Sequence, residues 1–200
     1  MHVADLVALI EKLGRSPVDL LGHSYGGAVA ALLAQSRPDL IRKLVLVEPA
    51  LYSLWPSCPG GQEYLQDMAA WRAEMRAKID AGQDPVAIVR AMYDDDRPGT
   101  FDSFPAWRRQ TLIDNARTTA SLFANSLLSL PFGCGEAQRI AMPVLLVEGQ
   151  KTGPGMRAIG TRLLECLPDS RRAVLPGAGH VIQFDAPEAM AVVVADFLAR

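Results

Sequence analysis

The stretch DLLGHSYGGAVA, residues 19–30, decides how this chain is expected to fold. VDLL, at 18–21, is a short apolar run typical of a strand buried in a parallel sheet. Residues 26–35 are rich in Ala and Leu and predict a helix. Between them, GHSYG at 22–26 matches G-x-S-x-G, a pattern that places its serine on a sharp turn. We therefore predict a strand, a turn and a helix in immediate succession.

The turn marks Ser24 as a candidate nucleophile. It must hold Ser24 in a strained backbone conformation, and a side chain at Gly22 or Gly26 is expected to collide across it. At the start of a helix, free backbone N–H groups and the helix dipole favour developing negative charge, so the Tyr25 N–H is the predicted oxyanion donor. The alternative interpretation is a glycine-rich turn in which Ser24 only caps the helix.

A serine nucleophile needs a base, and the chain has three histidines. His2 lies at a terminus that is expected to fray. His23 adjoins Ser24 inside the turn, where neighbouring side chains point apart. His180 follows the last predicted strand in the glycine-rich stretch PGAGHVIQF, which can carry an imidazole over the carboxyl edge of the sheet. We therefore predict His180 as the base, with a loop histidine bonded to backbone as the alternative.

Two predicted strand ends carry a carboxylate that can orient the histidine. Glu48 ends the apolar run KLVLVE, and Glu148 ends PVLLVE just before Gly149. A carboxylate at the carboxyl end of a strand reaches the site, whereas one within the strand faces the core or a helix. Glu48 is the preferred acid and Glu148 the alternative. The non-catalytic alternative for Glu48 is a salt bridge to a neighbouring Arg or Lys.

The rest of the chain predicts an α/β fold with a parallel sheet of about four strands flanked by helices, into which an all-helical segment is inserted. The predicted divisions are a first core segment at 1–50 with the turn, a helical cap at 51–138, and a second core segment at 139–200 with the histidine. Strands are predicted at 18–21, 43–50, 143–149 and 172–175. Helices are predicted at 3–13, 26–35, 61–80, 84–92, 105–116, 118–129, 154–167 and 186–200, with a turn or loop at 93–104.

Composition excludes several other classes of protein. The formal net charge is -2 and the Lys and Arg residues are scattered, which argues against a nucleic-acid partner. The start of the chain is not typical of a signal peptide, and no apolar run is long enough for a membrane span, so we predict a cytoplasmic protein. Asp94–Asp96 is better interpreted as a solvated loop or capping run than as a metal site. No metal is predicted.

The cysteine count is odd, at three, and their spacing suggests neither a metal site nor a disulfide framework. Cys58 and Cys134 neighbour Pro and Gly residues, so both are expected in loops. The third cysteine is Cys166. Three free thiols, as predicted here, fit a reducing compartment.

Together these residues resemble the α/β-hydrolase fold family. The order Ser24, Glu48, His180 is that family's order of nucleophile, acid and histidine. PVLLVEGQ and PGAGHVIQFDAPE resemble its last two strands and its histidine loop. Many members place an Asp where this chain has Thr152. Another branch, which includes certain haloalkane dehalogenases, places the acid one strand after the nucleophile, as Glu48 is.

The resemblance implies a serine hydrolase that cleaves an ester, thioester or activated C–C bond of a small, mainly apolar molecule through an acyl-enzyme, without a cofactor. Tyr52 and Trp55, which follow Glu48, are the predicted pocket-lining residues, with a role in the cap core as the alternative. A further alternative keeps an enzyme but makes it an acyltransferase or a cofactor-free haloperoxidase-like protein.

The chain departs from the family at its start, because family members have several strands before the nucleophile. The loop that supplies a second oxyanion donor belongs to that missing part. The strand at 18–21 would therefore have a bare edge, which favours homo-oligomers or implies a coding start further upstream. A catalytically inert or impaired half-domain is the main alternative to the serine hydrolase.

Overall fold

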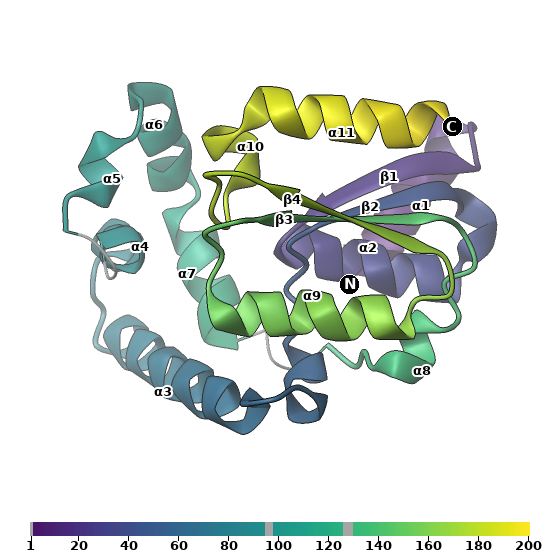
Figure 1. The fold of residues 1–200 in the computed structure, drawn as a ribbon. Coiled ribbons are helices and arrows are strands. Elements are labelled where there is room, and N and C mark those ends of the chain that lie inside the picture. The colour runs from purple at the N-terminus through teal and green to yellow at the C-terminus, as the bar shows by residue number, and fades with distance from the viewer. Residues whose placement is uncertain (1, 95–97, 126–129) are drawn as a thin grey trace. The chain divides into compact units, whose positions relative to one another are not determined.

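The computed structural model describes residues 2–94, 98–125 and 130–200 (Figure 1). The chain forms two compact units. Residues 1–64 and 128–200 form a unit that holds the sheet, and residues 65–127 form a helical unit. Every predicted site residue lies in the unit with the sheet. The cap boundaries at 51 and 138 stay a prediction about domains.

The sheet has four strands, all parallel, in the order β1-β2-β3-β4. Helices connect β1 to β2 and β3 to β4, as parallel neighbours require. The prediction of a parallel sheet of about four strands flanked by helices is confirmed. The strands are β1 (Val18–His23), β2 (Ile41–Val47), β3 (Val144–Gly149) and β4 (Ser170–Leu175).

Helices cover both faces of this sheet (Figure 1). On one face lies α11 (Pro187–Ala199), and on the other lie α2 (Tyr25–Ser36) and α9 (Pro154–Cys166). A further helix, α1 (His2–Leu13), packs against α2. The short helices of this unit are η1 (Pro38–Leu40), η2 (Tyr52–Ser57), α8 (Cys134–Ala137) and α10 (Ile182–Asp185).

The apolar runs of β2 and β3 are explained by burial on both sides. Val45 and Val147 belong to the apolar cluster that includes Phe197 of α11. Leu44 and Leu146 alternate with them along the strands and are fully buried on the opposite face. Strands packed on both faces need apolar residues at nearly every position, which is why the sequence shows runs rather than alternation.

The helical unit contains the predicted helices and one more. Its elements are α3 (Gly61–Asp80, which begins in the sheet unit), α4 (Pro85–Asp94), α5 (Thr100–Ser103), α6 (Ala106–Asp114) and α7 (Ala116–Asn125). The short helix α5 lies in the stretch predicted as a loop, because Phe101 is buried there against Val89 and Ala116. The helix predicted at 118–129 ends within residues 126–129, which lie outside the described residues.

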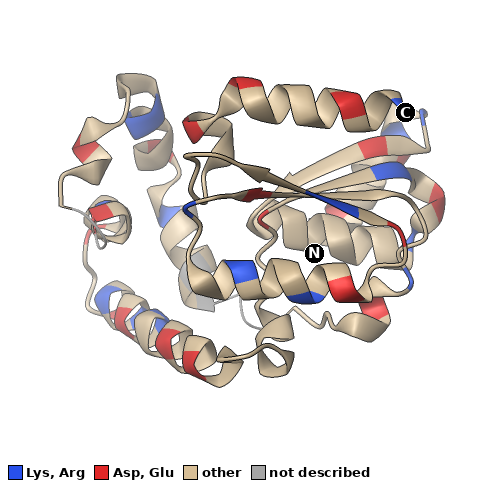
Figure 2. Cartoon of the chain, in the orientation of Figure 1, with Lys and Arg blue, Asp and Glu red and all other residues tan. Residues whose placement is uncertain are grey.

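Acidic and basic residues are interspersed along α3 (Figure 2). Arg76 pairs with Asp80, and Lys78 pairs with Glu74, at the spacing of one helical turn. Such exposed pairs contribute only a few tenths of a kcal/mol each. This charge pattern is typical of a solvated helix face.

The prediction of three free thiols is wrong. The structure joins Cys134, at the start of α8, to Cys166, at the end of α9, in a disulfide. Their Cα atoms are 5.1 Å apart, a normal separation for such a bond. Cys134 also lies in a helix rather than a loop. The spacing along the chain does not reveal the bond, because it depends on how α8 packs against α9.

Asp94 acts within the helical unit as a cap. Its carboxylate accepts a hydrogen bond of 2.8 Å from the backbone N–H of Phe101 in α5. Residues 95 and 96 lie outside the described residues. Within the described ranges there is no group of three His, Cys, Asp or Glu side chains placed to hold a metal ion, and no helix that is both long and apolar enough to cross a membrane.

Candidate active site

The strand β1 and the helix α2 are separated by Ser24 alone. Ser24 has φ 51° and ψ -120°, a region that residues with a side chain rarely adopt. Its N–H donates to the carbonyl of Val47, and its own carbonyl accepts from Ala50. The turn is therefore tied to the end of β2. The prediction that Ser24 is held in a strained conformation is confirmed.

Of the two glycines predicted to be sterically required, Gly22 is required and Gly26 is not. A Cβ on Gly22 would lie 2.5 Å from the carbonyl oxygen of Gly26, whereas a Cβ on Gly26 would have no neighbour within 4 Å. The second tight position is Gly27, whose Cβ would lie 3.0 Å from both Gly22 and Pro49. The backbone closes the turn between residue 22 and residues 26 and 27, so a side chain on Gly26 points away from it.

The three predicted catalytic residues form one hydrogen-bonded chain. The Nε2 atom of His180 lies 3.0 Å from the hydroxyl oxygen of Ser24. Its Nδ1 atom lies 2.8 Å from a carboxylate oxygen of Glu48. The hydroxyl of Ser24 makes no hydrogen bond that caps α2, so the interpretation of Ser24 as a helix cap is not supported. With Nδ1 protonated, Nε2 is free to accept the proton of Ser24.

Glu48 follows β2 with φ 43°, and its side chain is 1% exposed. Its second carboxylate oxygen accepts hydrogen bonds from the backbone N–H of Gly149, at 2.8 Å, and from the hydroxyl of Thr152. Burial raises the pKa of Glu48, but the bonds from His180, Gly149 and Thr152 outweigh it and hold the pKa below its ordinary value. The carboxylate is therefore ionised at neutral pH.

Thr152 is a partner that sequence reasoning missed. It is 4% exposed, and its hydroxyl donates to Glu48 across the ends of two strands. The signal that could have revealed it is its position in the sequence, because many members of the family that this chain resembles carry the acid itself there. A hydroxyl there supports a carboxylate that comes from the neighbouring strand.

The alternative acid, Glu148, has a different partner. It forms an ion pair with Arg172 of β4, and its other oxygen would overlap a Cβ on Gly160 of α9. Its carboxylate therefore lies on the α9 side of the sheet, away from the hydrogen bonds of His180. Burial raises the pKa of Glu148, although Arg172 partly offsets this effect.

The other two histidines lie beside the site without replacing His180. His23 directs its Nε2 atom to the backbone carbonyl of His180, at 2.8 Å. The ring of His2 meets the ring of Tyr25 edge to face, with 5.6 Å between centroids. Tyr25 is the first residue of α2, so its N–H has no acceptor within the helix and is placed next to Ser24.

Comparison with known proteins identifies the family of this chain. The sequence profile of the alpha/beta hydrolase family matches residues 1–193. The chain belongs to this family.

Several known proteins align with almost the whole chain. The mouse sn-1-specific diacylglycerol lipase ABHD11 is 25% identical over 98% of this chain and 63% of its own length. The 2-(acetamidomethylene)succinate hydrolase of Mesorhizobium japonicum is 23% identical over 98% and 69%. The structure of MenH from S. aureus superimposes with a TM-score of 0.73 at 15% identity over 98% and 73%. This chain therefore spans 63% to 73% of the length of these three proteins.

Tyr52 and Trp55, predicted to line the substrate pocket, are 8% and 4% exposed. Their rings stack at 4.6 Å between centroids. The indole N–H of Trp55 donates to the carbonyl of Gly155 in α9, at 2.9 Å. These contacts connect η2 to α9 and favour the alternative role in a core, here the core of the sheet unit. A contact of either residue with substrate stays a prediction.

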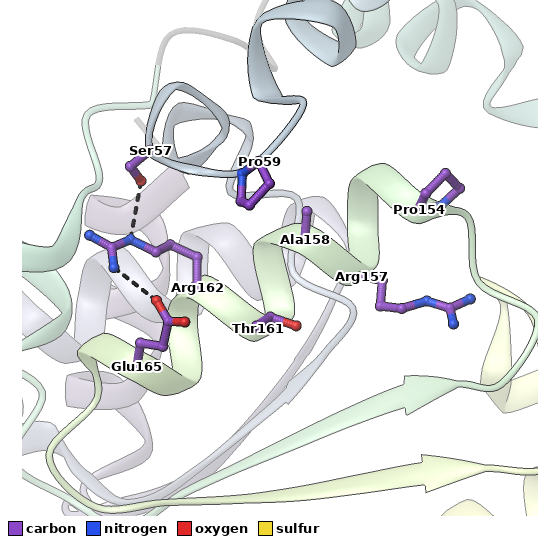
Figure 3. A pocket seen from close by; sticks show the side chains of 8 residues that line it. All are labelled: Ser57, Pro59, Pro154, Arg157, Ala158, Thr161, Arg162 and Glu165. Carbon is purple, nitrogen blue, oxygen red and sulfur yellow. Dashed lines mark hydrogen bonds and ion pairs between the residues drawn. The ribbon is translucent and has the colours of Figure 1, made fainter.

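A cavity of about 570 Å³ lies against α9, but none of the three catalytic candidates lines it (Figure 3). Arg162 projects from α9 beside it, donating to Ser57 and pairing with Glu165. The remaining lining residues are Pro59, Pro154, Arg157, Ala158 and Thr161. The candidate site is therefore located by the hydrogen bonds between Ser24, His180 and Glu48 rather than by this cavity.

Proposed function

We propose that this alpha/beta hydrolase is a serine hydrolase in which Ser24 is the nucleophile, His180 the base and Glu48 the residue that orients it. The observation that carries the proposal is the continuous chain of hydrogen bonds from Ser24 through His180 to Glu48. Backbone strain supports it, because Ser24 and Glu48 are the two described non-glycine residues with positive φ. Strained residues concentrate at functional sites.

The chemistry follows from these positions. His180 takes the hydroxyl proton of Ser24 at Nε2 while the serine oxygen attacks a carbonyl carbon. The carbonyl oxygen becomes an oxyanion, which the N–H of Tyr25 stabilises at the start of α2. The tetrahedral intermediate collapses when the imidazolium gives its proton to the leaving group. A water molecule, deprotonated by His180, then releases the acyl group and regenerates Ser24.

We propose an ester, a thioester or an activated C–C bond of a small, mainly apolar molecule as the bond that is cleaved. Family members of similar sequence support this range, since they include a diacylglycerol lipase and a hydrolase of a substituted succinate. All three kinds of bond place a carbonyl carbon within reach of a serine oxygen.

A fluorophosphonate probe tests the proposed nucleophile without knowledge of the substrate. The expected result is one covalent adduct, located by peptide mass spectrometry on Ser24, and none on Ser24→Ala. Heat-unfolded protein is the control, because an unactivated serine does not react at a comparable rate. Folded protein that carries no adduct, or an adduct on another residue, would refute Ser24 as the nucleophile.

We also propose that two copies of the chain pair through the free edge of β1. Within the described part of the chain, β1 has only β2 as a neighbour. Ser24 donates to Val47 of β2, so alternation turns the N–H of Leu21 toward the free edge. The side chain of Leu21 is 43% exposed. Two such edges related by a twofold axis complete each other's hydrogen bonds.

Sedimentation velocity distinguishes backbone pairing from simple apolar contact at this edge. We expect a concentration-dependent dimer for the wild-type protein and a monomer for Leu21→Pro, which lacks the donor N–H. Leu21→Thr is the control, because it keeps the N–H and suits a strand. A monomeric wild-type protein at high concentration would contradict the proposal, as would a Leu21→Pro dimer.

A further inference from the structure

His23, the residue before the nucleophile, is bonded to the residue that carries the base. Its Nε2 atom lies 2.8 Å from the backbone carbonyl oxygen of His180. The two imidazole rings lie 4.9 Å apart between centroids, inclined by 41°. The side chain of His180 reaches back to Ser24. His23 therefore holds the backbone of His180, and the adjacent Ser24 is bonded to the ring of His180.

The partners of His23 define where its proton lies. A carbonyl oxygen can only accept, so Nε2 must carry the proton that is donated to His180. The Nδ1 atom then accepts from the side-chain amide of Gln183, at 3.4 Å. Burial lowers the pKa of His23, although its hydrogen bond to the carbonyl of His180 opposes this effect. An imidazole that is neutral at neutral pH carries one N–H group, which agrees with the single hydrogen bond that His23 donates.

The part of the loop just before His180 is held by close packing and by hydrogen bonds. Gly177 has φ 74°, and the loop packs so closely on the end of β3 that a Cβ on Gly149 would lie 2.5 Å from the Gly179 carbonyl. The N–H of Lys151 donates to the carbonyl of Ala178, and the N–H of Gly179 donates to Asp185. The carbonyl of His180 itself is held by His23.

We propose that His23 is a positioning residue that fixes the distance between Nε2 of His180 and the hydroxyl of Ser24. The inference rests on the proposed function, because it concerns the same nucleophile and base. Proton transfer depends steeply on this distance, and a displacement of the base by about 1 Å can cost a hundredfold in rate. Once its carbonyl is released, the peptide of His180 can rotate, and its imidazole then shifts relative to Ser24 although the residues just before it stay attached.

Two amide substitutions separate the donor from the rest of the side chain. In His23→Gln the amide nitrogen occupies the place of Nε2 and can donate to His180. In His23→Asn the nitrogen reaches only the place of Nδ1, so the carbonyl loses its donor. The second-order rate of fluorophosphonate reaction at Ser24 is the readout. We expect His23→Asn to react about tenfold more slowly and His23→Gln within about threefold of wild type.

Rescue by glutamine is the result that a merely structural role would not produce. Melting temperatures of the two variants are compared first, and His23→Leu, which also lacks the donor, replaces an Asn variant that does not fold. Equal rates for His23→Asn and wild type would overturn the inference, as would equally slow Gln and Asn variants. A wild-type protein without any adduct on Ser24 would refute the proposed function itself, whereas the other outcomes leave it intact.

Discussion

Glu48→Gln is expected to lower the turnover number by about 10⁴-fold, the loss typical of replacing a triad acid by its amide. The amide still accepts hydrogen bonds from Gly149 and Thr152, so the fold is expected to persist. Its NH₂ group, however, faces Nδ1 of His180 and forces the proton onto Nε2. Nε2 then donates toward Ser24 and can no longer accept its proton.

Glu148→Gln is the matched control for this prediction. It removes the same charge from the neighbouring strand, but its hydrogen bond is to Arg172 rather than to His180. We expect its turnover number to stay within about tenfold of wild type, because breaking a partly buried ion pair acts mainly on stability. Hydrolysis of p-nitrophenyl esters and the rate of Ser24 phosphonylation are both measured. Loss of both in Glu148→Gln alone would show that Glu148 is the acid.

The pH dependence of stability offers an independent check on Glu48. Its pKa in the folded protein is below the ordinary value of 4.5. A carboxyl group whose pKa falls on folding stabilises the protein above its unfolded-state pKa, and this stabilisation is lost as the pH falls through the folded-state pKa. Glu48→Gln is therefore expected to flatten the decline of the melting temperature below pH 4.5.

The catalytic candidates could be predicted from the sequence because each lies at, or a few residues beyond, the carboxyl end of a strand. Parallel strands bring their carboxyl ends to one edge of the sheet, so the sequence predicts Ser24, Glu48 and His180 at the same edge. Elimination among three histidines was enough to select His180. The same reasoning left Glu148 open, because a strand end does not reveal to which face a carboxylate turns.

Features that depend on packing between distant segments were missed. The Cys134–Cys166 bond joins the ends of two helices, and the buried Thr152 meets a carboxylate from another strand. The position of His23 next to Ser24 argues against its being the base. Its bond to the carbonyl of His180 could not be predicted, because the distance between the turn and the loop depends on tertiary packing and not on local sequence.

Composition and contacts between elements divide the chain at different points. Composition changes after residue 50, where Pro and aromatic residues become frequent. In the structure, η2 nevertheless belongs with the sheet, because Trp55 is bonded to α9 and is buried beside it. The long helix α3 begins in the sheet unit and continues into the helical one. The change in composition thus marks the point after which the chain forms no strand until β3. Tertiary contacts, however, decide which of the following segments pack with the sheet.

Gly22→Ala is expected to destabilise the sheet unit by about 3 kcal/mol or more, a large loss for a single methyl group. The new Cβ would lie 2.5 Å from the carbonyl oxygen of Gly26 and 2.8 Å from the Cα of Gly27. Both are backbone atoms, so the clash cannot be relieved by rotating a side chain. The turn must open, and Ser24 loses its strained conformation and its bonds to β2 with it.

Gly26→Ala, four residues further along, is the matched control. A Cβ there meets nothing within 4 Å, and the position lies in the first turn of α2. Alanine is favoured over glycine in helices by up to about 1 kcal/mol, so this variant should be as stable as wild type or slightly more so. Urea midpoints followed by circular dichroism compare the two variants. Equal midpoints for Gly22→Ala and Gly26→Ala would contradict the prediction, because residue 22 would then have room for a Cβ beside the backbone of residues 26 and 27.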